Sequence, residues 1–260
     1  EKKLREGRGQ GHGAGYRPWV SVHDFSSKGD ACRELGSTTG RMHDFLSRWE
    51  LKYFRIVDNL APMVIDIREQ WPLLPIEATI FLSKSLGIPH PADNEGLVVM
   101  TTDFLLDVEQ KGGTVQVART IKMSEALHKP RTLEKLALEQ MYYRMRGIDW
   151  AVVTEKDIPE ELYLNADRIR GHKKLTGHLT PDLFRRVEPV LFRNVAGSRK
   201  SLAETCLDTD AQLGLTDGDS LSMVYHCIAN GYWDVDVARN IDPGQPLQVR
   251  KRVSVAVGGV

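Results

Sequence analysis

The sequence lacks the features that mark a secreted, zinc-binding or membrane protein. Its three cysteines are far apart, with no Cys-x-x-Cys pair among Cys32, Cys206 and Cys227. We therefore expect neither a disulfide framework nor a zinc site. No stretch approaches the roughly 20 apolar residues of a membrane span, and the first residues lack the apolar region of a signal peptide. The sequence predicts a cytoplasmic protein that has no membrane partner.

The chain also lacks an excess of either charge, because 35 basic residues balance 35 acidic ones. Net charge therefore argues neither for nor against nucleic acid, and any DNA-binding surface must be a local patch. If basic clusters converge on one face, they can contact phosphates without reading the base sequence. Taken singly, each cluster is more often scattered solvated charge. The candidate DNA-binding residues are Arg168, Arg170, Lys173, Lys174, Arg185 and Arg186.

The length allows one large domain or two ordinary ones, and the composition, 41% hydrophobic and 27% charged, is that of a globular protein. Residues 1–17 are rich in glycine and basic residues without periodicity, which predicts a flexible basic arm. Residues 18–164 show the order helix, strand, hairpin, helix, strand, which is typical of a mixed α/β domain. We expect helices within 40–59 and 129–147, strands within 63–75 and 149–155, and a further helix at 77–87.

Residues 165–260 have a different character. Three helical patterns, each with a Ser or Thr at or near its start, lie within 179–194, 201–214 and 220–232, and strand-like runs follow at 232–238 and 247–257. Three helices and a strand pair are the layout of a winged helix. A different small helical domain is equally compatible with the pattern. We expect the end of the chain to form a tail that binds a partner.

The segment Thr101–Lys122 predicts a hairpin, with glycines at its tip between two strand-like runs. In this register Asp103 lies opposite about Thr120, and Gln116 and Ala118 share its face because side chains alternate along a strand. Hydrolysis of a phosphodiester with Mg²⁺ needs hard oxygen ligands and a cation that orients or activates water. An exposed Asp on a strand is commonplace, so the hairpin alone does not establish this chemistry.

Several longer segments are similar to the TnsA family, the endonuclease subunits of heteromeric cut-and-paste transposases, including those of CRISPR-guided transposons. The similarity covers residues 7 to about 160. It implies a restriction-endonuclease-like fold that uses Mg²⁺, or Mn²⁺ in its place, to cleave the 5′ strands of double-stranded transposon ends. It also implies a TnsB-type transposase and a TnsC-type ATPase as partners, and a nucleoid-associated location. The matching segments are GRGQGHGAGYRPWVSVHDFSSKG, RMHDFLSRWELKYF, VIDIREQWPLLP, TTDFLLD and RTLEKLALE.

The resemblance also implies roles for individual residues. The catalytic glutamate on a helix is Glu50 in RWELKYF, and the metal-binding aspartate is Asp103 in TTDFLLD. Gln116 holds the second strand position, where a backbone carbonyl can also serve the metal. Glu139 in KLALE is a weaker candidate metal ligand. The lysine of the family belongs two residues after Gln116, where this chain has Ala118.

Lys122 is not expected to replace the missing lysine. It lies four residues beyond Ala118, about 13 Å along a strand at ~3.3 Å per residue, and a lysine side chain reaches about 6 Å. We interpret the chain as a nuclease in which one change from lysine to alanine strongly impairs cleavage. Two alternatives stay open: a non-catalytic architectural subunit that holds DNA and bridges TnsB and TnsC, and an endonuclease that cuts without partners.

Overall fold

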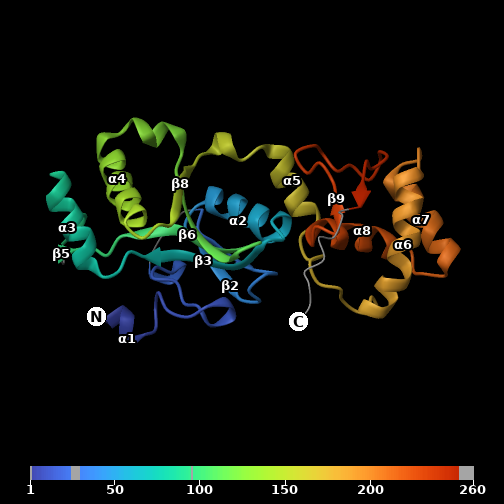
Figure 1. Ribbon diagram of the computed structural model, residues 1–260, viewed down its shortest axis with the longest axis horizontal. Helices are drawn as coiled ribbons and strands as arrows, with labels where there is room; N and C mark the ends of the chain where they lie inside the picture. The colour runs from blue at the N-terminus through green and yellow to red at the C-terminus, as the bar shows by residue number, and fades with distance from the viewer. Residues whose placement is uncertain (1, 25–29, 95, 252–260) are drawn as a thin grey trace. The chain divides into compact units, whose positions relative to one another are not determined.

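The computed structural model describes residues 2–24, 30–94 and 96–251 (Figure 1). The chain divides into two compact units, the first formed by Glu1–Phe54 and Met63–Ile158 and the second by Arg55–Pro62 and Pro159–Val260. Helix α2 (Arg48–Leu60) therefore contributes to both units. The predicted boundary after Leu164 lies inside helix α5 (Glu160–Arg168), all of which belongs to the second unit.

The first unit is built on a four-stranded sheet. Its order is β3 (Val64–Pro72), β6 (Thr101–Gln110), β7 (Gly113–Ile121) and β8 (Asp149–Val153). Strand β6 is antiparallel to both of its neighbours, β3 and β7, whereas β8 runs parallel to β7. A parallel pair requires a crossover connection, which here contains helix α4 (Pro130–Arg144) (Figure 1). The expectation of a mixed α/β domain is confirmed, and its mixed sheet is consistent with a restriction-endonuclease-like fold.

Alternating residues of β6 divide the core of the first unit between the two faces of the sheet. Leu105 packs in a cluster with residues of α3 (Ile76–Leu86) and α4 (Pro130–Arg144). Phe104 points to the other face, where its ring centroid lies 5.2 Å from that of Tyr53 on α2. This period of two is what a strand buried on both faces requires.

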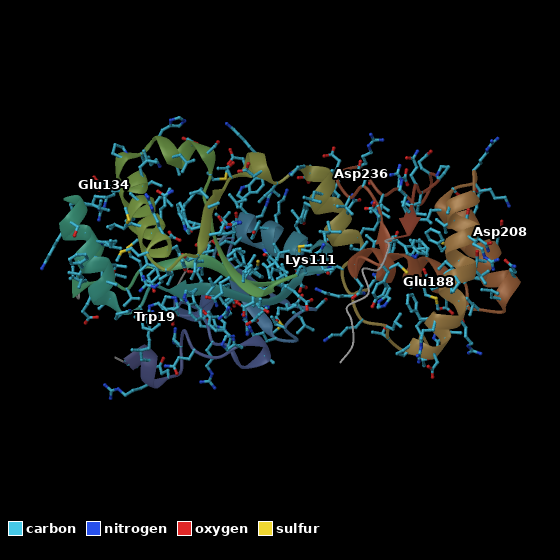
Figure 2. The ribbon with its side chains drawn as sticks, in the orientation of Figure 1. Trp19, Lys111, Glu134, Glu188, Asp208 and Asp236 are labelled. Atoms are coloured by element: carbon cyan, nitrogen blue, oxygen red, sulfur yellow. The ribbon has the colours of Figure 1, made fainter. Side chains whose placement is uncertain are left out.

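The hairpin of β6 and β7 is confirmed, with glycines in its turn. Phe104 pairs with Arg119 and Gln110 pairs with Gly113, which leaves Lys111 and one glycine in the turn (Figure 2). Gly113 has a φ of 122°, a conformation that glycine adopts without strain. Shorter elements of the first unit are α1 (Lys2–Arg5), β1 (Cys32–Leu35), β2 (Met42–Phe45), β4 (Ala92–Asp93) and β5 (Gly96–Leu97).

The prediction of a flexible arm at residues 1–17 is wrong for its described part, which starts at residue 2. Tyr16 is buried, and its hydroxyl donates to the carbonyl of Glu69, 3.0 Å away. Gly9 has a positive φ, and a Cβ there would lie 2.4 Å from Cγ of Pro72. The glycines therefore allow turns and close approach to β3, whereas composition alone suggested disorder.

Besides the end of α2, the described part of the second unit contains four helices: α5, α6 (Pro181–Gly197), α7 (Leu202–Leu213) and α8 (Asp219–Ala229). The three predicted helical patterns correspond to α6, α7 and α8. Hydroxyl side chains cap two of them, since Thr180 accepts from Leu183 N and Ser201 accepts from Glu204 N. Among the described helices, none combines the length and the apolar character needed to cross a membrane.

The strand pair of the second unit is short in the described chain. Residues Trp233–Asp234 (β9) pair antiparallel with Arg250–Lys251 (β10). The predicted second strand and the predicted partner-binding tail continue into residues 252–260, which lie outside the described residues. The winged-helix assignment therefore stays a prediction.

Candidate active site

Glu50 lies in the first turn of α2, where the sequence Ser-x-x-Glu favours a helix start. Ser47 Oγ accepts from the backbone N of Glu50 at 3.2 Å and donates to Glu50 Oε1 at 2.9 Å. The backbone N of Leu46 donates to Glu50 Oε2 at 3.0 Å. These bonds fix a carboxylate that is 7% exposed. Burial, and then the charge of Asp103, raise the pKa of Glu50 to about 7.

Asp103 lies on the central strand β6 and makes its contacts at the end of β7. Its Oδ2 accepts from the backbone N of Ile121 at 2.6 Å and from Lys122 Nζ at 3.1 Å. Lys122 Nζ also donates to the carbonyl of Ile121 at 2.9 Å. Burial alone would lower the pKa of Lys122, but the charge and the hydrogen bond of Asp103 outweigh it, so the pKa is raised. The lysine is therefore an ammonium ion held beside the aspartate.

The prediction that Lys122 cannot reach the site is wrong. The hairpin pairs Phe104 with Arg119, so Asp103 and Thr120 are the next residues beyond the last pair of β6 and β7. The predicted distance of about 13 Å ran along the strand from Ala118 to Lys122. Asp103 lies near Thr120, midway between them, so only two residues separate Lys122 from the part of β7 that is nearest to Asp103. Ala118 is 0% exposed in the core cluster of the first unit, so it is not the vacant place of a lysine.

The predicted place of Gln116 at the site is also wrong. Gln116 pairs with Asp107, and its Nε2 donates to Asp107 Oδ1 at 3.2 Å. Four residues separate Asp107 from Asp103 on β6, which corresponds to about 13 Å along a strand. Gln116 therefore belongs to a different polar cluster and is not placed to bind a metal held by Asp103.

Glu139 on α4 is brought to the same region as predicted. Its Oε1 accepts from the hydroxyls of Thr102 and Thr120 and from Trp150 Nε1, the last at 3.0 Å. Burial raises the pKa of Glu139 to about 7, and the charge of Asp103 adds to this shift. The carboxyl group of Glu139 therefore accepts hydrogen bonds from three strands of the sheet, β6, β7 and β8.

A cavity of about 440 Å³ opens beside these groups in the first unit. Asp103, Thr120, Lys122 and Glu139 line it together with Lys135 of α4. The cavity therefore combines two carboxyl groups with two ammonium groups, as expected of a site that handles a phosphate and a cation together. Sequence reasoning missed Lys122, although counting strand pairs outward from the glycines of the turn would have found it.

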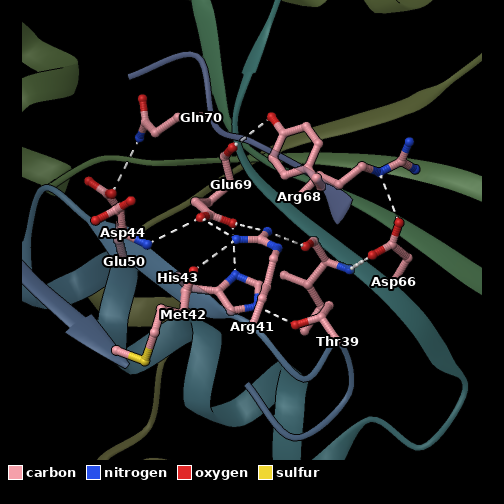
Figure 3. Close-up of polar contacts among 12 residues, drawn as sticks. Thr39, Arg41, Met42, His43, Asp44, Glu50, Asp66, Arg68, Glu69 and Gln70 are labelled. Carbon is pink, nitrogen blue, oxygen red and sulfur yellow. Dashed lines mark hydrogen bonds and ion pairs between the residues drawn. The ribbon is translucent and has the colours of Figure 1, made fainter. Parts of the chain in front are cut away.

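Glu50 and Asp103 fit a divalent cation. Their carboxylates come from different elements, and both approach the amide of Gln70 on β3. Figure 3 shows the contact of this amide with Glu50. Gln70 Nε2 lies 3.4 Å from Glu50 Oε2 and 3.5 Å from Asp103 Oδ1. Carboxylate oxygens are ligands that Mg²⁺ and Mn²⁺ prefer. Burial is the main cause of the raised pKa of Glu50, and the negative charge of Asp103 adds to it, an effect that a bound cation would offset. Gln70 carried no signal in the sequence.

The predicted DNA-binding residues all lie in the second unit. Arg168 donates to Asn240 and Ile241, and Lys173 donates to the carbonyl of Asp58. Burial lowers the pKa of Lys173. These two residues bind their own unit, whereas the other four predicted residues are exposed: Arg170, Lys174, Arg185 and Arg186.

We predict that Glu139→Gln removes a pH dependence of stability. A folded-state pKa near 7, above the ordinary 4.5, means that the folded chain binds the proton more tightly, so stability falls as pH rises between these values. Glutamine does not titrate. The variant should match the wild type at pH 5 and exceed its free energy of unfolding at pH 8 by up to about 3 kcal/mol.

Urea unfolding at both pH values, without divalent ions, measures this difference. Glu134→Gln is the matched control, because Glu134 lies on the same helix with its side chain 39% exposed (Figure 2). Equal pH dependence in wild type and Glu139→Gln would show that Glu139 is already ionised in the folded chain.

Comparisons with known proteins agree with this arrangement. Residues 61–155, which contain the whole four-stranded sheet of the first unit, match the family described as TnsA-like endonuclease N terminal. The chain is 35% identical over 231 residues to the Transposon Tn7 transposition protein TnsA of Escherichia coli. The match covers 89% of this chain and 83% of that protein, so it extends beyond the first unit. The chain therefore belongs to the TnsA family of transposition endonucleases.

Proposed function

We propose that this chain is a catalytically competent Mg²⁺-dependent endonuclease that hydrolyses phosphodiester bonds in DNA. The observation that carries the proposal is the contact of Lys122 Nζ with Asp103 Oδ2, 3.1 Å long, at a cavity that both residues line. The amide of Gln70 links Asp103 to the buried Glu50. Two acids and an ammonium group are what such hydrolysis needs. The hypothesis of an impaired nuclease rested on Ala118, whose place in the apolar core removes that reason.

Glu50 and Asp103 would hold the ion, with Glu139 close enough to affect its charge balance. Bound Mg²⁺, or Mn²⁺, supplies a Lewis acid for the phosphate and lowers the pKa of a bound water. Lys122 stays protonated beside Asp103 and can orient the attacking water or stabilise charge on the phosphate. Lys135 lines the same cavity and can bind a neighbouring phosphate.

The substrate we propose is double-stranded DNA at transposon ends, cleaved on the 5′ strands. Because the chain belongs to the TnsA family, we expect it to act in a transposase complex together with a TnsB-type transposase and a TnsC-type ATPase. The exposed basic residues of the second unit, such as Arg170 and Arg186, would contact DNA phosphates. An association with CRISPR-guided transposition stays a prediction.

The test is a cleavage assay on labelled transposon ends with the two partner proteins and Mg²⁺. We expect the wild-type chain to cut the 5′ strands and Asp103→Asn to lose cutting, because the variant loses a charge of the ion site. Asp149→Asn is the matched control, since Asp149 lies on β8 with its side chain 66% exposed. A wild-type chain that assembles with its partners on DNA and does not cut would favour the architectural alternative.

A further inference from the structure

Gln70 has an unusual backbone conformation for a residue inside a strand. It is the one non-glycine residue with a positive φ, 48°, in the described part of the chain. It lies between the pairs Glu69 with Phe104 and Trp71 with Thr102, and thus opposite Asp103. A left-handed conformation is strained for a non-glycine residue and persists where the surroundings enforce it. Such strain at a buried position points to a role in the site.

Neighbouring contacts hold this conformation in place. Glu69 is 0% exposed and binds Arg41 at 2.5 Å and His43 Nδ1 at 2.7 Å (Figure 3). Burial would raise the pKa of Glu69, but hydrogen bonds from Arg41 and His43 lower it to about 2, so Glu69 is ionised. The backbone N of Trp19 also donates to the carbonyl of Gln70 at 3.2 Å. The strand is therefore anchored at Glu69 and at the strained residue itself.

The side chain of Gln70 is placed between the two acids of the site. Its Nε2 lies 3.4 Å from Glu50 Oε2 and 3.5 Å from Asp103 Oδ1, long for hydrogen bonds, as if one amide is shared by two acceptors. Its Oε1 accepts from Thr101 Oγ1 at 3.1 Å. A hydroxyl can both donate and accept, so Thr101 can bind either end of the amide.

We propose that Gln70 is a third oxygen ligand of the divalent ion, reached by rotation of its amide. Without an ion, Nε2 faces the two carboxylates and offsets their repulsion. When an ion binds, the amide of Gln70 would rotate so that Oε1 faces the ion between the carboxylates. Nε2 would then donate to Thr101 Oγ1. Side-chain amide oxygens are ordinary ligands of hard cations. This inference rests on the proposed function, because it assumes an ion at Glu50 and Asp103.

The experiment titrates the purified chain with Mn²⁺, followed by electron paramagnetic resonance of the free ion, so that no cleavage is needed. Gln70→Gly should weaken Mn²⁺ binding about tenfold. Glycine adopts a φ of 48° without strain, so this variant should keep its fold. Gln70→Glu should bind Mn²⁺ more tightly than the wild type, because it adds a charged oxygen ligand at nearly the same volume. Gln110→Ala is the matched control and should leave binding unchanged, because Gln110 is exposed beside the turn of the hairpin.

The outcomes separate this inference from the proposed function. If Asp103→Asn weakens Mn²⁺ binding and Gln70→Gly does not, Gln70 is not a ligand although the ion site stands. If Gln70→Gly does not fold, Gln70→Glu decides, since unchanged or weaker binding by that variant overturns the inference. If the wild type and Asp103→Asn bind Mn²⁺ equally, the ion site itself is misplaced and the proposed function fails with it.

Discussion

Lys122→Met is expected to slow cleavage of the 5′ strands by about 10²–10³-fold, the usual cost of losing one charged group that stabilises a transition state. Methionine keeps an unbranched side chain of similar length, so the end of β7 should retain its packing. Because the variant keeps both carboxylates, we expect Mn²⁺ binding to be preserved. Cleavage of labelled ends and Mn²⁺ titration of the same preparation measure the two effects.

Lys111→Met is the matched control for this variant. Lys111 lies in the exposed turn of the same hairpin, so its loss should leave cleavage unchanged (Figure 2). Cleavage by Lys122→Met at the wild-type rate would show that the ammonium group near Asp103 serves only as an ion-pair partner of that carboxylate.

The sequence predicted the four strands of the central sheet and the helices α2, α3 and α4, and the family resemblance pointed to two acids of the site. The short strand pairs β1–β2 and β4–β5 were not predicted. Hydrophobic patterning and glycine turns predict the hairpin, including the register that places Asp103 near Thr120. Glu50 follows a Ser-x-x-Glu helix start, a local signal that fixes where its carboxylate points. These features could be predicted because neighbours in sequence determine them.

The lysine was misassigned because a short motif was matched without the register. Gln116 and Ala118 resemble the family's Gln-x-Lys pattern apart from the last residue. Pairing along the hairpin, which the sequence had already indicated, brings Lys122 next to Asp103. A match of two or three residues is therefore weaker than a geometric relation between strands.

Other features depend on contacts between distant segments and leave little trace in the sequence. The positive φ of Gln70 has no marker such as glycine or asparagine. The N-terminal glycines suggested disorder, but close approach to β3 explains Gly9. In each case the conformation is enforced by tertiary packing, which overrides the local preference.

Ala118→Lys should destabilise the first unit by about 3–5 kcal/mol, because it adds volume and an unpaired charge to a packed core. Ala118 is 0% exposed and packs in the cluster that contains Leu105 and Leu138. Thermal and urea unfolding would measure the loss. Val115→Lys on the same strand is the matched control, since Val115 is 38% exposed and should tolerate lysine.

The double variant that joins Ala118→Lys with Lys122→Met decides which position the catalytic lysine occupies. An ammonium group at position 118 would lie among the apolar side chains of the core cluster. Position 118 is two residues before Thr120 in the sequence, whereas Lys122 is two residues after it. We therefore expect the double variant to cleave no faster than Lys122→Met and to be less stable. Recovery of Mg²⁺-dependent cleavage by the added lysine would contradict the assignment, because it would mean that a side chain at position 118 reaches the scissile phosphate and that Lys122 is dispensable.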